Sequence, residues 1–194
     1  MSKIILCSQS PRRQELLERM GVRDFSVVVP HADEGYDPAM TPQEIVCHIS
    51  REKARAAAAL CGAEDLLITA DTMVFLDDKR LGKPADEAEA FRMLSALSGR
   101  EHLVCTGVTV RRGDTARTEA ETTAVRFASL TPEEIRWYVA TGEPMDKAGA
   151  YGIQGKGALL VEGITGDFFN VMGLPVRRLR RMLEAFGVNL LGEE

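Results

Sequence analysis

Near its start the chain contains the stretch Ile4-Ile5-Leu6-Cys7-Ser8-Gln9-Ser10-Pro11-Arg12-Arg13-Gln14-Glu15-Leu16-Leu17. The apolar run Ile4–Leu6 predicts a short buried strand. Ser10 followed by Pro11 predicts a helix N-cap and the first helical residue. Leu16 and Leu17 give this helix an apolar face, so the stretch predicts a strand that leads directly into a packed helix. That order favours an α/β fold.

Two arginines lie in the first turn of the predicted helix. Arg12 and Arg13 would lie near free backbone N–H groups and the positive end of the helix dipole, which costs roughly a few tenths of a kcal/mol. A bound anion would reverse this cost, because a helix N-terminus and two guanidinium groups together suit a phosphate. The alternative is that both arginines are simply solvated.

The composition is that of a globular protein with a substantial core. The 194 residues suit one domain or a two-lobed unit, and 45% of them are hydrophobic. The net charge is −5, which argues against nonspecific nucleic-acid binding, because that function needs a basic surface. A small anionic ligand remains compatible with a locally basic pocket.

The cysteines and the apolar segments indicate a cytoplasmic protein that neither spans nor enters a membrane. No two cysteines form a C-x-x-C pair, so free thiols in a reducing compartment are expected. We find no apolar run long enough for a signal peptide or a transmembrane helix. The four cysteines are Cys7, Cys47, Cys61 and Cys105.

Strand and helix patterns alternate along the chain, which predicts one α/β domain over residues 1–194, with a mixed sheet in two lobes. The predicted strands are Ile4–Leu6, Phe25–Val29, Leu66–Ala70, Met73–Leu76, Leu103–Val110, Thr118–Phe127 and Ala158–Val161. The predicted helices begin at Pro11, Pro42, Asp86, Pro132 and Pro175, and capping boxes at Thr41 and Thr131 precede two of them. The glycine-rich stretch Thr141–Gly157 is predicted to be a functional loop.

Two carboxylates are candidates for a metal site. Asp71 directly follows the apolar strand Leu66–Ala70, and ligands of α/β proteins bind at the carboxyl ends of strands. Glu34 follows the strand Phe25–Val29, and Mg²⁺ is usually held by one or two carboxylates together with substrate phosphates. The alternatives are an ordinary turn aspartate and a solvated acidic loop.

A lysine and a glutamine are further candidates for ligand binding. Lys83 lies between Gly82 and Pro84, which fix the backbone around a single positive charge suited to phosphate. Gln154 has a donor and an acceptor with which to recognise a base edge. These residues predict metal-assisted handling of a phosphorylated small molecule.

Six motifs, in order along the chain, resemble those of the Maf nucleotide pyrophosphatases, from about Ile4 to Leu179. They are Ser8-Gln9-Ser10-Pro11-Arg12-Arg13, Ala70-Asp71-Thr72, Gly82-Lys83-Pro84, Thr106-Gly107-Val108, the Gly142–Gly157 loop and Asn170-Val171-Met172-Gly173-Leu174-Pro175. The resemblance implies an inosine triphosphate pyrophosphatase-like fold, in which helices flank a mixed elongated sheet and a central cleft separates two lobes. It also implies a homodimer that uses a divalent cation, Mg²⁺, Mn²⁺ or Co²⁺.

The implied activity is hydrolysis of nucleoside triphosphates to nucleoside monophosphate and pyrophosphate, which cleans the nucleotide pool. Thr72 and the loop Tyr151-Gly152-Ile153-Gln154-Gly155 resemble the branch that cleaves dTTP and UTP, with modified pyrimidine nucleotides as further substrates. Two alternatives remain open. One is a noncatalytic nucleotide-binding regulator of cell division and septum formation, and the other is a pyrophosphatase for 7-methyl-GTP or other purine nucleotides.

The resemblance also implies a role for each matching residue. Asp71 matches the catalytic aspartate, and it would hold the metal together with Glu34. The positions linked to substrate choice are Arg12, Thr72 and Gln154, and the phosphate-binding positions are Ser8, Arg13, Lys53 and Lys83. Cys7 departs from the alanine that is usual in the family, a change expected to alter only the packing.

Overall fold

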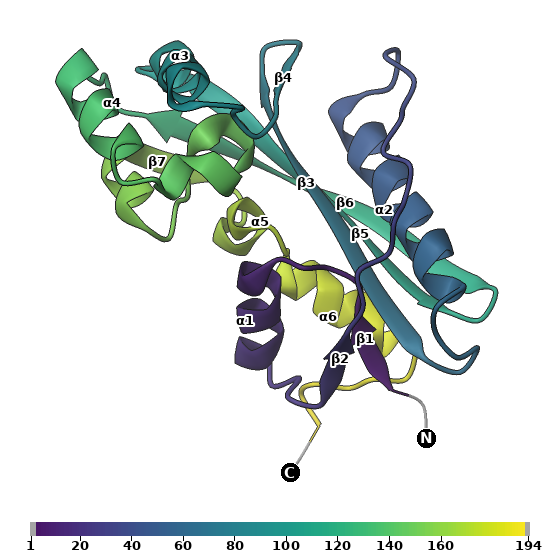
Figure 1. Cartoon of the computed structure of the whole chain (residues 1–194). Helices are drawn as coiled ribbons and strands as arrows, with labels where there is room; N and C mark the ends of the chain where they lie inside the picture. Colours follow the sequence, from purple (N-terminus) through teal and green to yellow (C-terminus); the bar gives the residue numbers. More distant parts are fainter. Residues whose placement is uncertain (1–2, 193–194) are drawn as a thin grey trace. The chain divides into compact units, whose positions relative to one another are not determined.

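The computed structural model describes residues 3–192 and contains a seven-stranded mixed sheet (Figure 1). The strands are β1 (Ile4–Leu6), β2 (Phe25–Val27), β3 (Leu66–Leu76), β4 (Lys79–Leu81), β5 (Glu101–Arg112), β6 (Thr115–Phe127) and β7 (Val161–Thr165). Their order is β2-β1-β3-β5-β6-β7, and β4 pairs with β3. β1 runs parallel to β2 and β3, whereas the β3–β4 and β6–β7 pairs are antiparallel. The predicted mixed α/β fold is therefore confirmed.

Six α-helices and three short 3₁₀-helices flank the sheet in the described residues. They are α1 (Pro11–Arg19), α2 (Pro42–Ala58), α3 (Glu87–Leu97), α4 (Pro132–Val139), α5 (Phe168–Met172), α6 (Val176–Glu184), η1 (Glu143–Asp146), η2 (Ala148–Ala150) and η3 (Lys156–Leu160). The capping boxes predicted at Thr41 and Thr131 are both formed, because each threonine and the glutamate three residues later bond to the other's backbone N–H.

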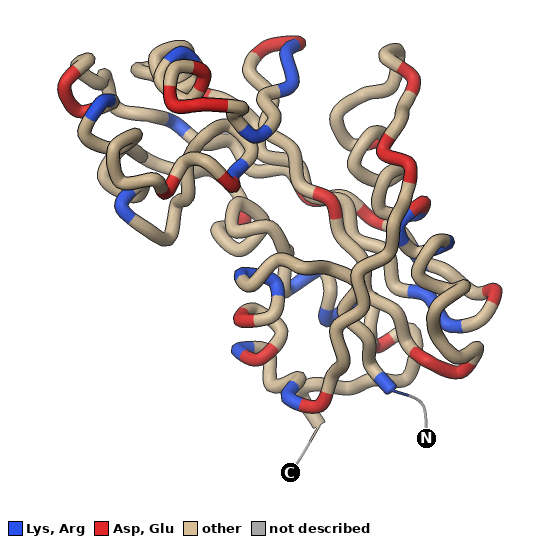
Figure 2. Tube along the Cα trace, viewed as in Figure 1, with Lys and Arg blue, Asp and Glu red and all other residues tan. Residues whose placement is uncertain are grey.

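The described chain forms two compact units. The first takes in the residues up to Asp71, then Thr106–Glu121 and the residues from Gly173 onward. The second contains Thr72–Cys105 and Thr122–Met172. The strands β3, β5 and β6 contribute residues to both units, and charges of both signs are spread over each unit (Figure 2).

In the first unit, α2 lies on one side of the strands, and α1 and α6 lie on the other side (Figure 1). A glycine allows α2 to approach the sheet closely, because a Cβ atom at Gly107 would lie 2.2 Å from the Val46 carbonyl oxygen. One turn further along α2, the buried Ser50 hydroxyl donates to Thr109 Oγ1 over 2.9 Å. Ser50 also accepts, at its carbonyl oxygen, a 2.8 Å bond from the Thr69 hydroxyl. These contacts fix the rotation of α2 on β3 and β5.

Two of the predicted strand assignments are wrong. The predicted strands Leu66–Ala70 and Met73–Leu76 are one continuous strand, β3, so Asp71 lies within a strand and not after its end. The predicted strand Ala158–Val161 is largely the 3₁₀-helix η3, and β7 begins only at Val161. A short apolar run does not distinguish a strand from a buried helical turn, and this explains the second error.

Other features agree with the sequence or add to it. All four cysteines are free, as expected. The sequence patterns did not reveal β4 or α5, which are only three and five residues long. Among the described residues, every helix is too short or too polar to cross a bilayer.

An aromatic cluster containing a histidine forms part of the core of the second unit. His102 is 2% exposed, and its ring packs edge-on against Phe127 and Tyr151 at centroid distances of 5.1 and 5.3 Å. His102 Nε2 also lies 2.8 Å from the Tyr151 hydroxyl. Burial lowers the pKa of His102 from its ordinary 6.5 to about 4.

This buried histidine makes the stability of the protein depend on pH. Between about pH 6.5 and pH 4 the unfolded chain binds a proton that the folded chain excludes, so the free energy of unfolding falls as the pH falls. The loss is about 3 kcal/mol over this window. We expect His102→Gln to flatten this part of the profile in urea titrations at about pH 7 and about pH 4.5. His31→Gln, at an exposed side chain, is the control, and equal slopes for both variants would contradict the prediction.

Candidate functional site

Asp71 lies in the middle of β3 with its side chain almost buried. Only 11% of the side chain is exposed, and Oδ1 accepts a 2.7 Å bond from Lys53 Nζ. The other oxygen, Oδ2, is buried and accepts no hydrogen bond from the described part of the protein. A buried carboxylate oxygen without a hydrogen-bond donor is energetically costly unless a proton, a cation or a water molecule satisfies it. Asp71 Oδ2 is therefore available to bind a cation or to accept a proton.

Lys53 joins two acidic side chains of the first unit. Its Nζ lies 3.0 Å from Glu34 Oε1 as well as 2.7 Å from Asp71 Oδ1. Lys53 lies on α2 three residues after Ser50, so the bonds that Ser50 makes to the sheet also direct Lys53 toward β3. The structure thus brings together the two carboxylates that the sequence proposed as a pair, with a lysine between them.

Arg13 and Ser8 connect the start of α1 to the same strand. Arg13 donates through Nη1 to the Ala70 carbonyl over 2.8 Å and to Ser8 Oγ over 3.1 Å. Its Nε donates to the Gly173 carbonyl over 2.8 Å. Burial lowers the pKa of Arg13, and the charge of Asp71 opposes this shift. Arg13 therefore links the start of α1 to β3 and to Gly173, and its contact with phosphate stays a prediction.

The N-cap of α1 differs in detail from the sequence expectation. Ser10 occupies the N-cap position, but its side chain makes no capping bond. Ser8 Oγ accepts the Ser10 N–H instead, over 3.2 Å. Arg12 lies half-buried in the first turn of α1, as predicted.

The remaining predicted residues belong to the second unit. Thr72 is half-buried and follows Asp71 in β3. Lys83 is exposed in the loop after β4, and Gln154 is exposed between η2 and η3. The backbone beside Lys83 is held by a 3.0 Å bond from the Gly149 N–H to the Gly82 carbonyl.

The glycine-rich stretch is more ordered than a mobile loop. It contains η1, η2 and the start of η3, and Ala150, Tyr151 and Ile153 are buried. A carboxylate that sequence reasoning did not single out, Glu143, accepts hydrogen bonds from three other residues of this unit. Its only sequence signal was its place among the glycines.

The carboxylates fit a divalent cation that is completed by substrate. No group of three or more histidine, cysteine, aspartate or glutamate side chains within residues 3–192 is placed to hold a metal. Mg²⁺ often needs only one or two carboxylates, with phosphate and water supplying the other oxygens. Asp71 and Glu34 meet that requirement, because both approach one cationic atom and Asp71 keeps a buried oxygen that accepts no bond from the described residues.

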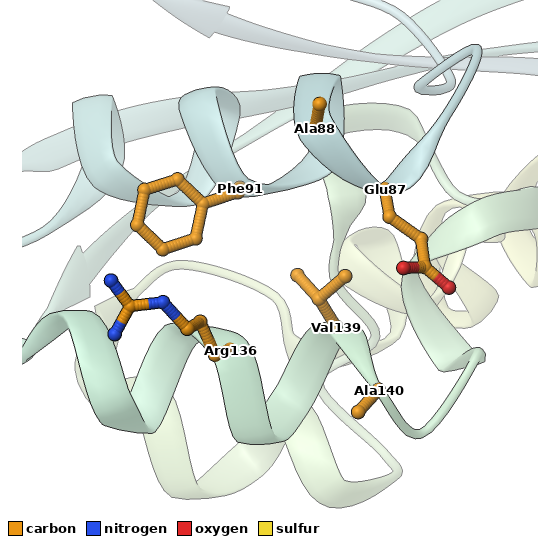
Figure 3. Close-up of a pocket in the computed structure, with 6 residues that line it drawn as sticks. All are labelled: Glu87, Ala88, Phe91, Arg136, Val139 and Ala140. Carbon is orange, nitrogen blue, oxygen red and sulfur yellow. The ribbon is translucent and has the colours of Figure 1, made fainter.

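A separate hollow of about 270 Å³ lies between α3 and α4 (Figure 3). The Arg136 guanidinium lies over the Phe91 ring, 5.6 Å from its centroid. None of the predicted site residues lines this hollow. The lining residues are Glu87, Ala88, Phe91, Arg136, Val139 and Ala140.

The fold and the first-unit cluster together define a class: an α/β protein whose buried carboxylate and nearby cations suit a phosphorylated small molecule. A family model described as "Maf-like protein" matches residues 3–186. The chain belongs to this Maf family.

Curated relatives match over nearly the whole chain. A protein of Symbiobacterium thermophilum named dTTP/UTP pyrophosphatase is 52% identical, over 96% of this chain and 95% of its own. A protein of the same name from Moorella thermoacetica is 51% identical, over 99% of both chains. Another relative of this name, from Bacillus pumilus, is 47% identical over 97% of this chain and 98% of its own.

Solved structures with similarity to the chain include two Ham1 proteins. The Staphylococcus aureus protein is 14% identical, with a TM-score of 0.48 over 95% of this chain and 97% of its own. The Coxiella burnetii protein is also 14% identical, with a TM-score of 0.47 over 95% and 100% of the two chains.

The contact between Lys53 and Asp71 can be measured by a double-mutant cycle. Lys53→Met leaves the Asp71 carboxylate buried without its cation, so we expect the free energy of unfolding in urea to fall by about 2 kcal/mol. In an Asp71→Asn background the same change should cost less by about 1 kcal/mol. The exposed Arg126–Glu162 pair is the matched control and should show a coupling below about 0.5 kcal/mol. Equal costs of Lys53→Met in both backgrounds would refute the coupling.

Proposed function

We propose that this chain hydrolyses dTTP and UTP, together with modified pyrimidine nucleotides, to the nucleoside monophosphate and pyrophosphate. The reaction would remove unwanted nucleotides from the pool. Asp71 carries the proposal, because it offers a buried carboxylate oxygen that has no donor within residues 3–192, beside a cation and a second carboxylate. The names of relatives about 50% identical over nearly their full length support the substrates.

Asp71 would act as the general base. A water molecule attacks the α-phosphorus, its oxygen forms the new P–O bond, and its proton passes to Asp71 Oδ2. The bond from the α-phosphorus to the bridging oxygen breaks, and pyrophosphate leaves with the electron pair. Proton transfer to a positioned base of this kind contributes about 10²–10⁴ in rate.

The cations of the chain would compensate the charge of the triphosphate. The phosphates would be bound by Lys53, Lys83 and Arg13, with Ser8 as a hydroxyl donor. The positive charges would have their largest effect on the negative charge that develops on the leaving pyrophosphate in the transition state. A divalent cation held by Glu34 and Asp71 would supply further charge neutralisation on the phosphate oxygens.

Substrate choice would depend on Arg12, Thr72 and Gln154. The Gln154 amide offers both a donor and an acceptor, which match the carbonyl and N–H edge that thymine and uracil share. A purine or 7-methylguanine presents a different edge to the same amide, so exchange of Gln154 should alter preference more than rate.

Pyrophosphate release across a panel of nucleotides tests the proposal. We expect release from dTTP and UTP with Mg²⁺, Mn²⁺ or Co²⁺, and slower release from dGTP and 7-methyl-GTP. Asp71→Asn should lower kcat at least about a hundredfold. The control is Glu162→Gln, at an exposed carboxylate of β7. Release only from a purine nucleotide would contradict the substrate assignment, and an active Asp71→Asn enzyme would contradict the catalytic one.

The metal, the assembly and the compartment are further parts of the proposal. Chelation by EDTA should abolish pyrophosphate release, and added Mg²⁺ should restore it, because the triphosphate carries more charge than the protein cations offset. We propose a homodimer in the cytoplasm, the compartment that holds the nucleotide pool. A monomer mass in sedimentation velocity or recovery outside the cytoplasmic fraction would contradict these two assignments.

A further inference from the structure

The backbone around Gln154 turns outside any strand and has weak support of its own. The turn is closed by a bond of 3.3 Å from the Gly155 N–H to the Gly152 carbonyl. This is longer than the usual range for such bonds, so it contributes little. Gln154 is exposed at the turn, whereas its neighbour Ile153 is buried. The local backbone bond therefore does little by itself to hold the backbone at Gln154 in place.

The carboxylate of Glu143 supplies that support from the start of the same stretch. Glu143 Oε2 accepts the Lys156 N–H over 2.9 Å, and Oε1 accepts the Gly157 N–H over 3.2 Å. Burial alone would raise the pKa of Glu143, but these two bonds, the Tyr138 hydroxyl and the charge of Lys147 lower it. The ionised carboxylate therefore holds the backbone just after Gln154.

Tyr138 extends the same support to the residues just before Gln154. Its hydroxyl donates to Glu143 Oε1 over 2.8 Å and accepts the Gly152 N–H over 3.0 Å. The Tyr138 side chain is fully buried on α4, and burial raises its pKa, so the hydroxyl keeps its proton and can donate. One carboxylate and one phenol thus hold both ends of the segment 152–157.

Two of the three glycines of the segment, Gly155 and Gly157, lie tightly against this carboxylate and this phenol. A Cβ atom at Gly155 would lie 2.5 Å from Glu143 Oε1 and 2.6 Å from Oε2. A Cβ atom at Gly157 would lie 2.6 Å from the Gly152 carbonyl oxygen and 2.7 Å from the Tyr138 hydroxyl. The backbone passes so close to both groups only because these positions lack side chains. The glycines at positions 155 and 157 and the contacts made by Glu143 and Tyr138 therefore depend on one another.

We propose that Glu143 is the positioning residue for base selection: its carboxylate, with Tyr138, holds the segment 152–157 in the conformation that directs Gln154 at the pyrimidine. Glu143 does not touch the substrate and acts through the backbone. The inference rests on the proposed function, specifically on the role of Gln154 in base choice.

Glu143→Gln is the direct test, because it keeps the shape but turns an amide N–H₂ toward at least one donor. We expect the preference for dTTP over dGTP, as a ratio of kcat/KM values, to fall about tenfold. The loss should lie mainly in KM for dTTP, since the phosphate chemistry is unchanged. Amide hydrogen exchange at Lys156 and Gly157 should accelerate about tenfold or more.

Two matched variants separate positioning from general damage. Tyr138→Phe removes one hydroxyl from the same network and should give a smaller loss of preference in the same direction. Glu162→Gln removes an exposed carboxylate of the same unit and should change neither preference nor exchange in residues 152–157. A uniform rise in exchange over the whole second unit, with an equal fall in kcat for both nucleotides, would mean a purely structural role and would overturn the inference.

The failure of this inference can be distinguished from failure of the proposed function. If Gln154→Ala loses the preference for dTTP while Glu143→Gln keeps it, the inference is wrong and the proposed function stands. If the wild-type protein releases pyrophosphate from none of the nucleotides, the proposed function fails, and the role of Glu143 in base selection fails with it.

Discussion

The close approach of α2 to the sheet is the constraint on which the first unit depends. Gly107 has no side chain, so the backbone of α2 at Val46 lies directly against β5. At this short separation the Ser50 hydroxyl reaches Thr109 and its carbonyl accepts from Thr69, and these buried polar groups satisfy one another. A larger residue at position 107 would move the helix away from the sheet and break those bonds.

The position of α2 in turn determines which cation pairs with the candidate catalytic carboxylate, Asp71. Lys53 follows Ser50 by three residues on the same helical face, so its ammonium is brought to Asp71 and Glu34. A carboxylate in the middle of a strand that is otherwise almost entirely buried is tolerated because this cation compensates its charge. The same cation must share the two carboxylates with any divalent metal that binds there.

Features set by local rules were predictable from sequence, and features set by distant contacts were not. The capping boxes at Thr41 and Thr131 depend on residues three apart, and both form. Asp71 lies within β3, where its charge is paired with Lys53, eighteen residues away; the local sequence pattern contains no sign of this pairing and wrongly indicated a strand end. Asp71 was predicted to be functional because a strand was expected to end before it, which is wrong, whereas its match to the family motif Ala70-Asp71-Thr72 does not depend on where the strand ends.

The second unit shows why the glycine-rich stretch was harder to interpret than the motifs around it. Its order comes from contacts that no local pattern reveals: Glu143 holds the backbone beside Gln154, and Gly149 holds the carbonyl of Gly82 beside Lys83. Gly149 has a φ of +70°, and a Cβ atom there would also lie 3.0 Å from Val74 methyl groups, so a side chain is excluded twice. The glycine-rich stretch therefore positions both Lys83, a proposed phosphate ligand, and Gln154, which is proposed to recognise the base. A substitution at Gly149 should therefore weaken affinity for the triphosphate of every nucleotide, whereas a substitution at Glu143 or Gln154 should mainly change the choice of base.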